Sequence, residues 1–195
     1  MTEDLVARIA GAGPSVGPVR LVCVDGPAGA GKTTLAARLA KSLAPTFGAV
    51  PVVHGDDLYE GWAVVAGAPD RVTAFEAFAA RVEQWLIEPW GRGEPAVHPV
   101  RDWVADTWGP SVLVPAAPVV VLEGVGTAAR RLRPRAAVTV WVDVDPALGL
   151  ERVVERDGEA IRAQIVAWQR DETLWHVQDG TRAAADVRLS GDPPR

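Results

Sequence analysis

One eight-residue stretch has the residue types and spacing needed to hold a chain of phosphates. Residues 26–33 read Gly-Pro-Ala-Gly-Ala-Gly-Lys-Thr, which matches the pattern G-x-x-x-x-G-K-[ST]. Glycines let the backbone curl around phosphoryl oxygens so that several N–H groups point at them, and a helix that follows adds its positive N-terminal end. We expect a nucleoside triphosphate to be bound by Gly26, Pro27, Ala28, Gly29, Ala30, Gly31, Lys32, Thr33 and Thr34.

Two residues of this stretch carry side chains with chemical roles of their own. In a loop of this type the lysine, here Lys32, reaches the β and γ phosphates, and the hydroxyl of the next residue, Thr33, ligates Mg²⁺. Lysine occurs in this chain only at positions 32 and 41, which makes its place in the motif informative. A glycine-rich turn that happens to precede a lysine is the alternative interpretation, and the neighbouring elements must decide between the two.

Acidic residues stand at the ends of three apolar runs, where parallel strands place their ligands. They are Asp56 and Asp57, Glu123, and Asp143 and Asp145. Phosphoryl transfer to a hydroxyl needs one carboxylate to orient the hydroxyl and take its proton, and another acidic group to support Mg²⁺. We assign the first role to Asp56 and the second to Glu123. The alternatives are a helix N-cap for Asp56 or Asp57 and a solvated turn for Asp143 and Asp145.

Arginines from a mobile lid are suited to stabilise the charge that spreads over the transferring phosphoryl group. Arg152 and Arg156 are four residues apart, so both lie on one side of a predicted helix, and Arg162 is a weaker third candidate. A plain solvated helix, with Glu151 and Glu155 beside these arginines, is the alternative.

Candidates for contact with the phosphate acceptor fall in two places. Arg101, Asp102 and Trp103 combine a cation, a carboxylate and an aromatic face, which suits a sugar or a base, although an ordinary loop anchored by its tryptophan has the same composition. Tyr59 and Trp62 follow closely after Asp56 and are expected to line the same pocket. His54 and His176 are interpreted as structural.

Strand and helix patterns alternate along the chain, so the motif lies between a buried strand and an amphipathic helix. The periodicity predicts strands over residues 19–25, 50–54, 119–122, 138–144 and 185–189. It predicts helices over residues 5–10, 32–43, 73–87, 147–156 and 159–178, with Pro45 just beyond the end of the second and Pro146 in the first turn of the fourth. Residues 88–118 are expected to form loops and short elements. The predicted fold is a three-layer α/β sandwich with a mainly parallel five-stranded sheet, a single domain over 1–195, and a small helical lid at about 151–163.

The composition of the chain limits the classes of molecule that we expect it to bind. A net charge of −5 gives no general attraction to nucleic acid or to an anionic membrane, so we expect a small-molecule phosphate acceptor. The chain has one cysteine, Cys23, within an apolar run, and its first residues are acidic where a secretory signal is basic. These features favour a cytoplasmic location, and homo-oligomerisation stays open.

These motifs together resemble the uridine kinase-like branch of the P-loop kinases, which is related to the nucleoside and nucleotide kinases. The resemblance rests on VDGPAGAGKTTLA, HGDDLYEGW, VVVLEGVG, WVDVDP followed by ERVVERDG, and DGTRAAADVRL. It implies that the D-x-[FL]-Y motif of uridine kinases falls on Asp56 as catalytic base, with Tyr59 near the substrate. It also implies that Glu123 belongs to the Mg²⁺ environment and that Arg152 and Arg156 belong to the lid.

The chain departs from the uridine kinase pattern in two places. The Tyr-Asp-Phe motif that helps to hold the nucleoside reads Arg101-Asp102-Trp103, and the short region between Tyr59 and Thr73 shows no long substrate-covering hairpin. The resemblance implies ATP and Mg²⁺ as cofactors and transfer of the γ-phosphate to a small metabolite, with a nucleoside as the expected acceptor. A sugar or other small alcohol, or nucleotide binding without kinase activity, is the alternative. A small GTPase is disfavoured because the chain lacks an Asn-Lys-x-Asp motif.

Overall fold

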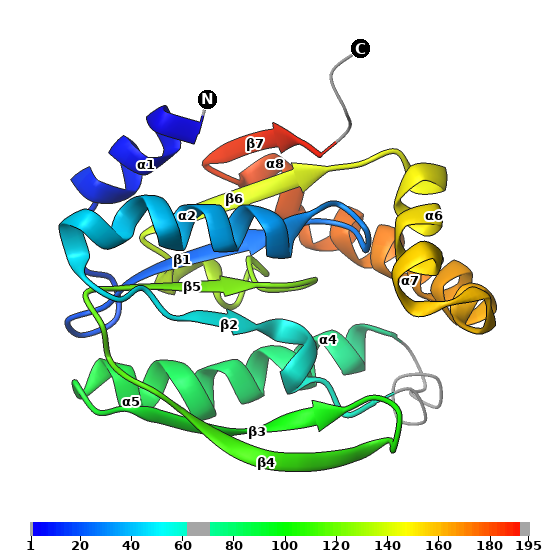
Figure 1. Cartoon of the computed structure of the whole chain (residues 1–195), viewed down its shortest axis with the longest axis horizontal. Helices are drawn as coiled ribbons and strands as arrows, with labels where there is room; N and C mark the ends of the chain where they lie inside the picture. The colour runs from blue at the N-terminus through cyan, green and yellow to red at the C-terminus, as the bar shows by residue number, and fades with distance from the viewer. Residues whose placement is uncertain (1, 62–70, 192–195) are drawn as a thin grey trace.

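The computed structural model describes residues 2–61 and 71–191, and its centre is a five-stranded parallel sheet (Figure 1). The strands are β1 (Arg20–Asp25), β2 (Val52–His54), β5 (Val119–Glu123), β6 (Val138–Asp143) and β7 (Val187–Ser190). They lie in the order β2-β5-β1-β6-β7, and every neighbouring pair is parallel. The predicted α/β fold with five strands is confirmed.

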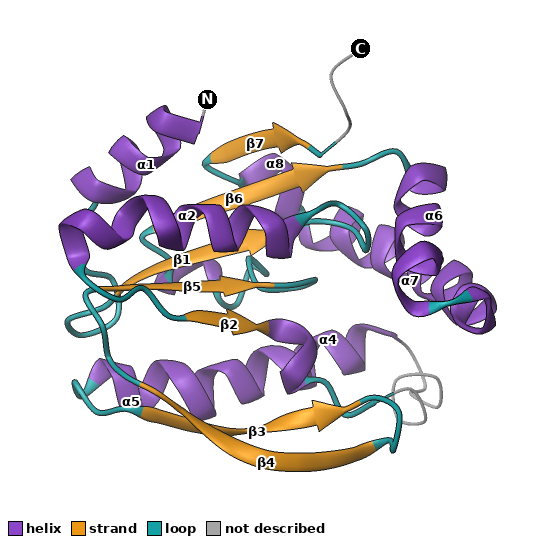
Figure 2. Cartoon of the chain, viewed as in Figure 1, coloured by secondary structure: helices purple, strands orange, loops and turns teal. Residues whose placement is uncertain are grey.

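Helices cover both faces of the sheet, which makes three layers (Figure 2). On one face α1 (Thr2–Gly11) and α2 (Lys32–Phe47) pack against Val22 and Val24 of β1. On the other face α4 (Arg71–Val82) and α7 (Arg162–Asp179) pack against Leu21 and Cys23. Because both faces of β1 and β5 are covered, nearly every residue of these strands is buried, as the apolar runs in the sequence indicate.

Two helices extend well beyond their predicted C-terminal ends. Helix α2 continues through Pro45 to Phe47, whereas the sequence pattern placed this proline just beyond the end of the helix. A proline in the last turn removes only one N–H group, and the chain ends the helix instead at Gly48, whose φ is 78°. The helix predicted over 73–87 runs further, because α4 passes through a π-helical turn (Glu83–Ile87) into α5 (Glu88–Gly91).

A β-hairpin occupies much of the region that was expected to hold only loops and short elements. Strands β3 (Ala96–Asp102) and β4 (Thr107–Val114) pair antiparallel in a separate sheet. Most side chains of β4 are exposed, so the strand has no alternating apolar pattern to reveal it. The Asp102 carboxylate accepts hydrogen bonds from the N–H groups of Val104 and Ala105 and thereby closes the turn.

The remaining elements are short, apart from α6 (Pro146–Asp157). They are the 3₁₀ helices at Gly55–Leu58, Arg133–Arg135 and Glu159–Ile161, and α8 (Thr181–Ala184). Asp145 caps α6 by accepting hydrogen bonds from the N–H groups of Ala147 and Leu148, and Asp143 pairs with Arg182, so both acids are used locally. Among the helices of the described residues, none is long and apolar enough to cross a membrane.

Candidate functional site

The phosphate-binding motif forms the turn between β1 and α2, as its position in the sequence predicts. Gly26, Gly29 and Gly31 have φ values of 146°, 77° and 88°, a region that favours glycine. At Gly26 the fit is also steric, because a Cβ atom there would lie 2.3 Å from the carbonyl oxygen of Val142. The loop therefore has the curled backbone that a phosphate cradle requires, and the alternative of a chance glycine-rich turn is disfavoured.

The loop opens onto a pocket of about 750 Å³ beyond the carboxyl ends of the strands. Six of the predicted loop residues line it, namely Ala28, Gly29, Gly31, Lys32, Thr33 and Thr34. Gly26, Pro27 and Ala30 are not among the residues that line it, and Ala30 is buried. The Lys32 ammonium donates 2.8 Å hydrogen bonds to the carbonyl oxygens of both Gly26 and Pro27, so the lysine that would contact phosphate is anchored to its own loop.

Thr33 and Glu123 meet at one side of the pocket. The Thr33 hydroxyl donates a hydrogen bond to Glu123 Oε1 at 2.9 Å, and His54 Nδ1 lies 2.6 Å from the same oxygen. The hydrogen bond with Glu123 raises the pKa of His54. A hydroxyl and a carboxylate this close are oxygen ligands of the type Mg²⁺ prefers, with further ligands coming from substrate phosphates and water. The two side chains thus fit the predicted metal role, and His54 contacts the same carboxylate.

Asp56 faces the same pocket from the turn after β2. The residue is exposed to solvent at the open pocket, and the protein around its carboxylate still raises the pKa above the usual 3.8 by partial desolvation. The positive charges of Lys32 and Arg156 oppose that rise, and the negative charge of Glu123 adds to it. The structure therefore brings the predicted base, the loop lysine and the predicted metal-site acid together.

The two predicted lid arginines both line the pocket from α6. Arg152 donates hydrogen bonds to the carbonyl oxygens of Gly29 and Gly191, so it braces the phosphate loop. Arg156 pairs with Asp157 and is near enough to Asp56 and Glu123 for their charges to raise its pKa, after the larger effect of Asp157. Arg162, the weaker candidate, pairs instead with Glu151 and Glu159 at the surface.

The predicted acceptor residues are only partly brought together. Tyr59 lines the pocket, but its hydroxyl donates to the carbonyl oxygen of Val125 and its ring stacks on Phe78 at 4.4 Å. Trp103 also lines the pocket, from the end of the hairpin. Trp62 lies outside the described residues.

Arg101 and Asp102 take a different place from the one predicted. The Arg101 guanidinium pairs with Asp106 and lies 5.4 Å from the centre of the Trp108 ring, within the hairpin. Asp102 closes the hairpin turn, and neither residue belongs to the pocket wall. Of the predicted triplet, Trp103 is the member that lines the pocket, because Arg101 is held by Asp106 and the Asp102 carboxylate closes the turn.

Apolar side chains that sequence reasoning did not single out complete the pocket wall. Ile161, Ile165 and Trp168 come from the start of α7 and the turn before it, and Val104 comes from the hairpin. Trp168 packs edge-on against Tyr59 at 5.5 Å. The acceptor side of the pocket therefore has an indole on each of two walls, Trp168 and Trp103.

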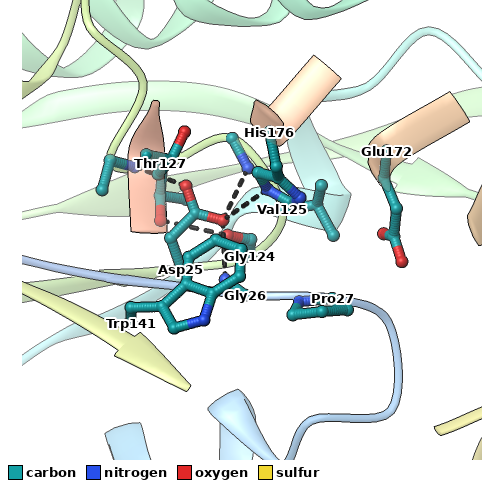
Figure 3. A network of polar contacts seen from close by, with 12 residues as sticks. Asp25, Gly26, Pro27, Gly124, Val125, Thr127, Trp141, Glu172 and His176 are labelled. Carbon is teal, nitrogen blue, oxygen red and sulfur yellow. Dashed lines mark hydrogen bonds and ion pairs between the residues drawn. The ribbon is translucent and has the colours of Figure 1, made fainter. Parts of the chain in front are cut away.

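A buried carboxylate directly before the loop, Asp25, was also missed (Figure 3). It accepts hydrogen bonds from the N–H groups of Gly26, Gly126 and Ala128, and His176 Nε2 lies 3.4 Å from it. Burial acts to raise the pKa of Asp25, but the His176 side chain and the backbone donors outweigh it and lower the pKa. Asp25 thus joins the loop, the turn after β5 and α7. The sequence does contain a signal for this residue, because it is an acidic residue at the end of an apolar strand and directly before the motif.

The loop also lies unusually close to α6 at two glycines. A Cβ atom on Gly149 would lie 2.7 Å from the carbonyl oxygen of Ala28, and one on Gly29 would lie 2.2 Å from the carbonyl oxygen of Gly149. Nothing in the sequence pattern singles out Gly149, because the constraint comes from a segment more than 100 residues earlier.

Replacing Gly149 with alanine is expected to weaken MgATP binding. Alanine is favoured over glycine within a helix by about 0.5–1 kcal/mol, but the methyl group would overpack the contact with Ala28 at about 1–3 kcal/mol. We expect the Kd for MgATP, measured by calorimetry, to rise about tenfold. Gly13→Ala is the matched control, since a Cβ atom there has nothing within 4 Å. An unchanged Kd in Gly149→Ala would show that α6 does not hold the loop.

Several solved structures of other proteins are similar to this chain. No family model and no curated protein sequence matches the chain. A protein from Bacillus stearothermophilus described as a possible uridine kinase aligns with a TM-score of 0.71 and 19% identity over 96% of each chain. A protein from Silicibacter sp. TM1040 described as a candidate fructose transport system kinase aligns with a TM-score of 0.66 and 22% identity, covering 97% of this chain and 98% of its own.

A gluconokinase from Sinorhizobium meliloti 1021 also aligns, with a TM-score of 0.53 and 17% identity, covering 93% of this chain and 86% of its own. At these identities the likeness concerns the fold. The arrangement of five parallel strands, phosphate loop and flanking helices found here is common to proteins described as acting on different acceptors. The chain therefore has the fold of the P-loop kinases.

Proposed function

We propose that the protein is an ATP- and Mg²⁺-dependent kinase that transfers the γ-phosphate to a hydroxyl of a small metabolite. The observation that carries the proposal is the Asp56 carboxylate, whose pKa is raised by its surroundings and which faces one pocket together with Lys32 and Thr33. A carboxylate placed beside a phosphate-binding loop is what proton removal from an acceptor hydroxyl requires.

In this mechanism each residue has a separate task. The loop N–H groups and Lys32 bind the phosphates, while Thr33 and Glu123 would hold the Mg²⁺ that neutralises developing charge. The acceptor oxygen forms a bond to the γ phosphorus as the bond to the oxygen shared with the β phosphate breaks. Asp56 takes the hydroxyl proton, and Arg156 faces the charge on the transferring group. ADP and the phosphorylated acceptor leave.

For the acceptor we propose a nucleoside, as in a uridine kinase-like enzyme. The two indoles, Trp168 and Trp103, and the buried Tyr59 give the acceptor side flat apolar walls, which suit the face of a base. The neighbour described as a possible uridine kinase is consistent with this choice. A sugar or another small alcohol is the second candidate, supported by the neighbours described as acting in fructose transport and on gluconate.

The test is product formation with purified protein, MgATP and a panel of nucleosides, sugars and polyols, read by mass spectrometry. We expect a phosphorylated nucleoside together with ADP, and no transfer when EDTA removes Mg²⁺. Transfer only to a sugar or polyol would keep the kinase and replace the acceptor. Binding of MgATP without transfer to any panel member would favour a nucleotide-binding protein without kinase activity, and absence of both binding and transfer would reject the proposal.

A further inference from the structure

A second buried acid, Glu172, contacts the phosphate loop from α7. Its side chain is only 1% exposed, and its two carboxylate oxygens accept a hydrogen bond from the Ala28 N–H at 3.1 and 3.2 Å. His176 lies one turn later on the same helix and contacts Asp25, and Figure 3 draws both side chains. Helix α7 therefore contacts both the loop and the residue directly before it.

The same carboxylate also binds the pocket wall. Trp168, one turn earlier on α7, makes a side-chain hydrogen bond with Glu172, and its indole lines the pocket. Burial raises the pKa of Glu172, while the charges of Lys32 and His176 and the hydrogen bonds from Ala28 and Trp168 oppose that rise. The buried carboxylate of Glu172 therefore has one hydrogen-bond partner in the backbone of the loop and another in an indole of the pocket wall.

We propose that Glu172 is a positioning residue that couples the acceptor wall to the phosphate loop. It holds the Ala28 N–H and the Trp168 indole in one shared set of hydrogen bonds, so a change at either end alters the other. Because coupling between two binding events is reciprocal, a nucleotide that orders the loop also fixes the indole against which the acceptor lies. This inference rests on the proposed kinase function and adds a residue to its site.

A double-mutant cycle on nucleotide affinity tests the coupling. The probe is the Mg²⁺ complex of AMP-PNP, a non-transferable ATP analogue, with Kd measured by calorimetry. Glu172→Gln keeps the shape and one acceptor oxygen, and Trp168→Phe removes the indole donor. We expect each single variant to weaken binding about tenfold, and the double variant to bind no more than about twofold worse than the weaker single one, because both changes break the same set of hydrogen bonds.

Two controls separate coupling from a general loss of packing. Trp108→Phe makes the same chemical change on strand β4, outside the pocket wall, and Asp171→Asn removes the same charge one residue away on α7. We expect either to change Kd by less than about twofold. Thermal melts establish that each variant is folded, and Glu172→Gln alone keeps the test valid if Trp168→Phe does not fold, because it must still weaken binding.

The outcomes are distinct from those of the kinase assay. Additive losses in the cycle, or an equal loss in Trp108→Phe, would overturn the coupling role of Glu172. An unchanged Kd in Glu172→Gln would overturn it while leaving the kinase proposal intact. A wild-type chain that binds no nucleotide would overturn both.

Discussion

Asp56→Asn is expected to lower the rate of phosphoryl transfer by about 10²–10⁴-fold while MgATP binding stays close to the wild-type level. The asparagine side chain keeps the size and one acceptor oxygen of the aspartate but cannot take a proton. Lys32, Thr33 and the loop that bind the phosphates are unchanged. Single-turnover transfer and calorimetric titration with MgATP, performed on the same preparation, measure the two quantities separately.

The raised pKa of Asp56 gives this prediction a second readout. A general base must be ionised, so wild-type kcat should rise with pH through the raised pKa, and the acidic limb should lie above pH 3.8. Ionisation of Asp56 has the opposite effect on folding stability. A folded-state pKa above the unfolded value means that ionisation opposes folding at neutral pH, so Asp56→Asn should melt at the same or a higher temperature than the wild type.

The neighbouring acid is the matched control for Asp56. Asp57 is half-buried, and after burial its pKa depends chiefly on His54 and His98 rather than on Lys32. Asp57→Asn should therefore retain most of the transfer rate. Equal losses in the two variants would mean that negative charge in this turn matters and that Asp56 has no specific role. Unchanged turnover in Asp56→Asn would remove it from the mechanism.

Asp25→Asn is expected to destabilise the whole domain, by about 3–5 kcal/mol. The amide nitrogen of asparagine cannot accept hydrogen bonds, so at least one N–H donor among Gly26, Gly126 and Ala128 loses its partner in a fully buried setting. Urea denaturation of both proteins at neutral pH gives the difference in free energy of unfolding.

The pH dependence identifies Asp25 as the source of that stability. Its folded-state pKa is lowered from 3.8, so the stabilisation is present at higher pH and is lost as pH falls below 3.8 toward the folded-state pKa. The difference between wild type and Asp25→Asn should accordingly shrink in that window.

Asp143→Asn is the control for Asp25, because Asp143 also has a lowered pKa but makes an ion pair with Arg182 at the surface. We expect a loss of about 1 kcal/mol or less there. A loss in Asp25→Asn as small as this would mean that the buried network relaxes without it.

The part of this protein that could be predicted from the sequence consists mainly of strands that are buried on both faces of the sheet. The strands β1 and β5 are buried on both faces and read as unbroken apolar runs, and the motif between β1 and α2 fixes the loop. The exposed strand β4 has no such pattern, so the hairpin was not recognised. Without the hairpin, nothing in the residue pattern indicated that Arg101 would pair with Asp106 across the turn.

Some site residues left a signal that went unread, and others left none. Glu172 falls at helical spacing among the buried Ile165, Trp168 and Trp175, and an acid on an apolar helix face is itself a sign of a specific partner. Gly149 leaves no sign, because the close approach of Ala28 depends on how distant segments assemble.

The order of the segments that hold the phosphate loop has a consequence for synthesis. The loop appears near the start of the chain, but its contacts come from the turn after β5, from Gly149, from Glu172 and His176, and from Arg152 together with Gly191. Contacts between residues this far apart in the sequence form late in folding. A nascent chain on the ribosome therefore contains the whole motif before the segments that contact and shape it have been synthesised. Nucleotide should accordingly stabilise the complete domain far more than it stabilises the growing chain.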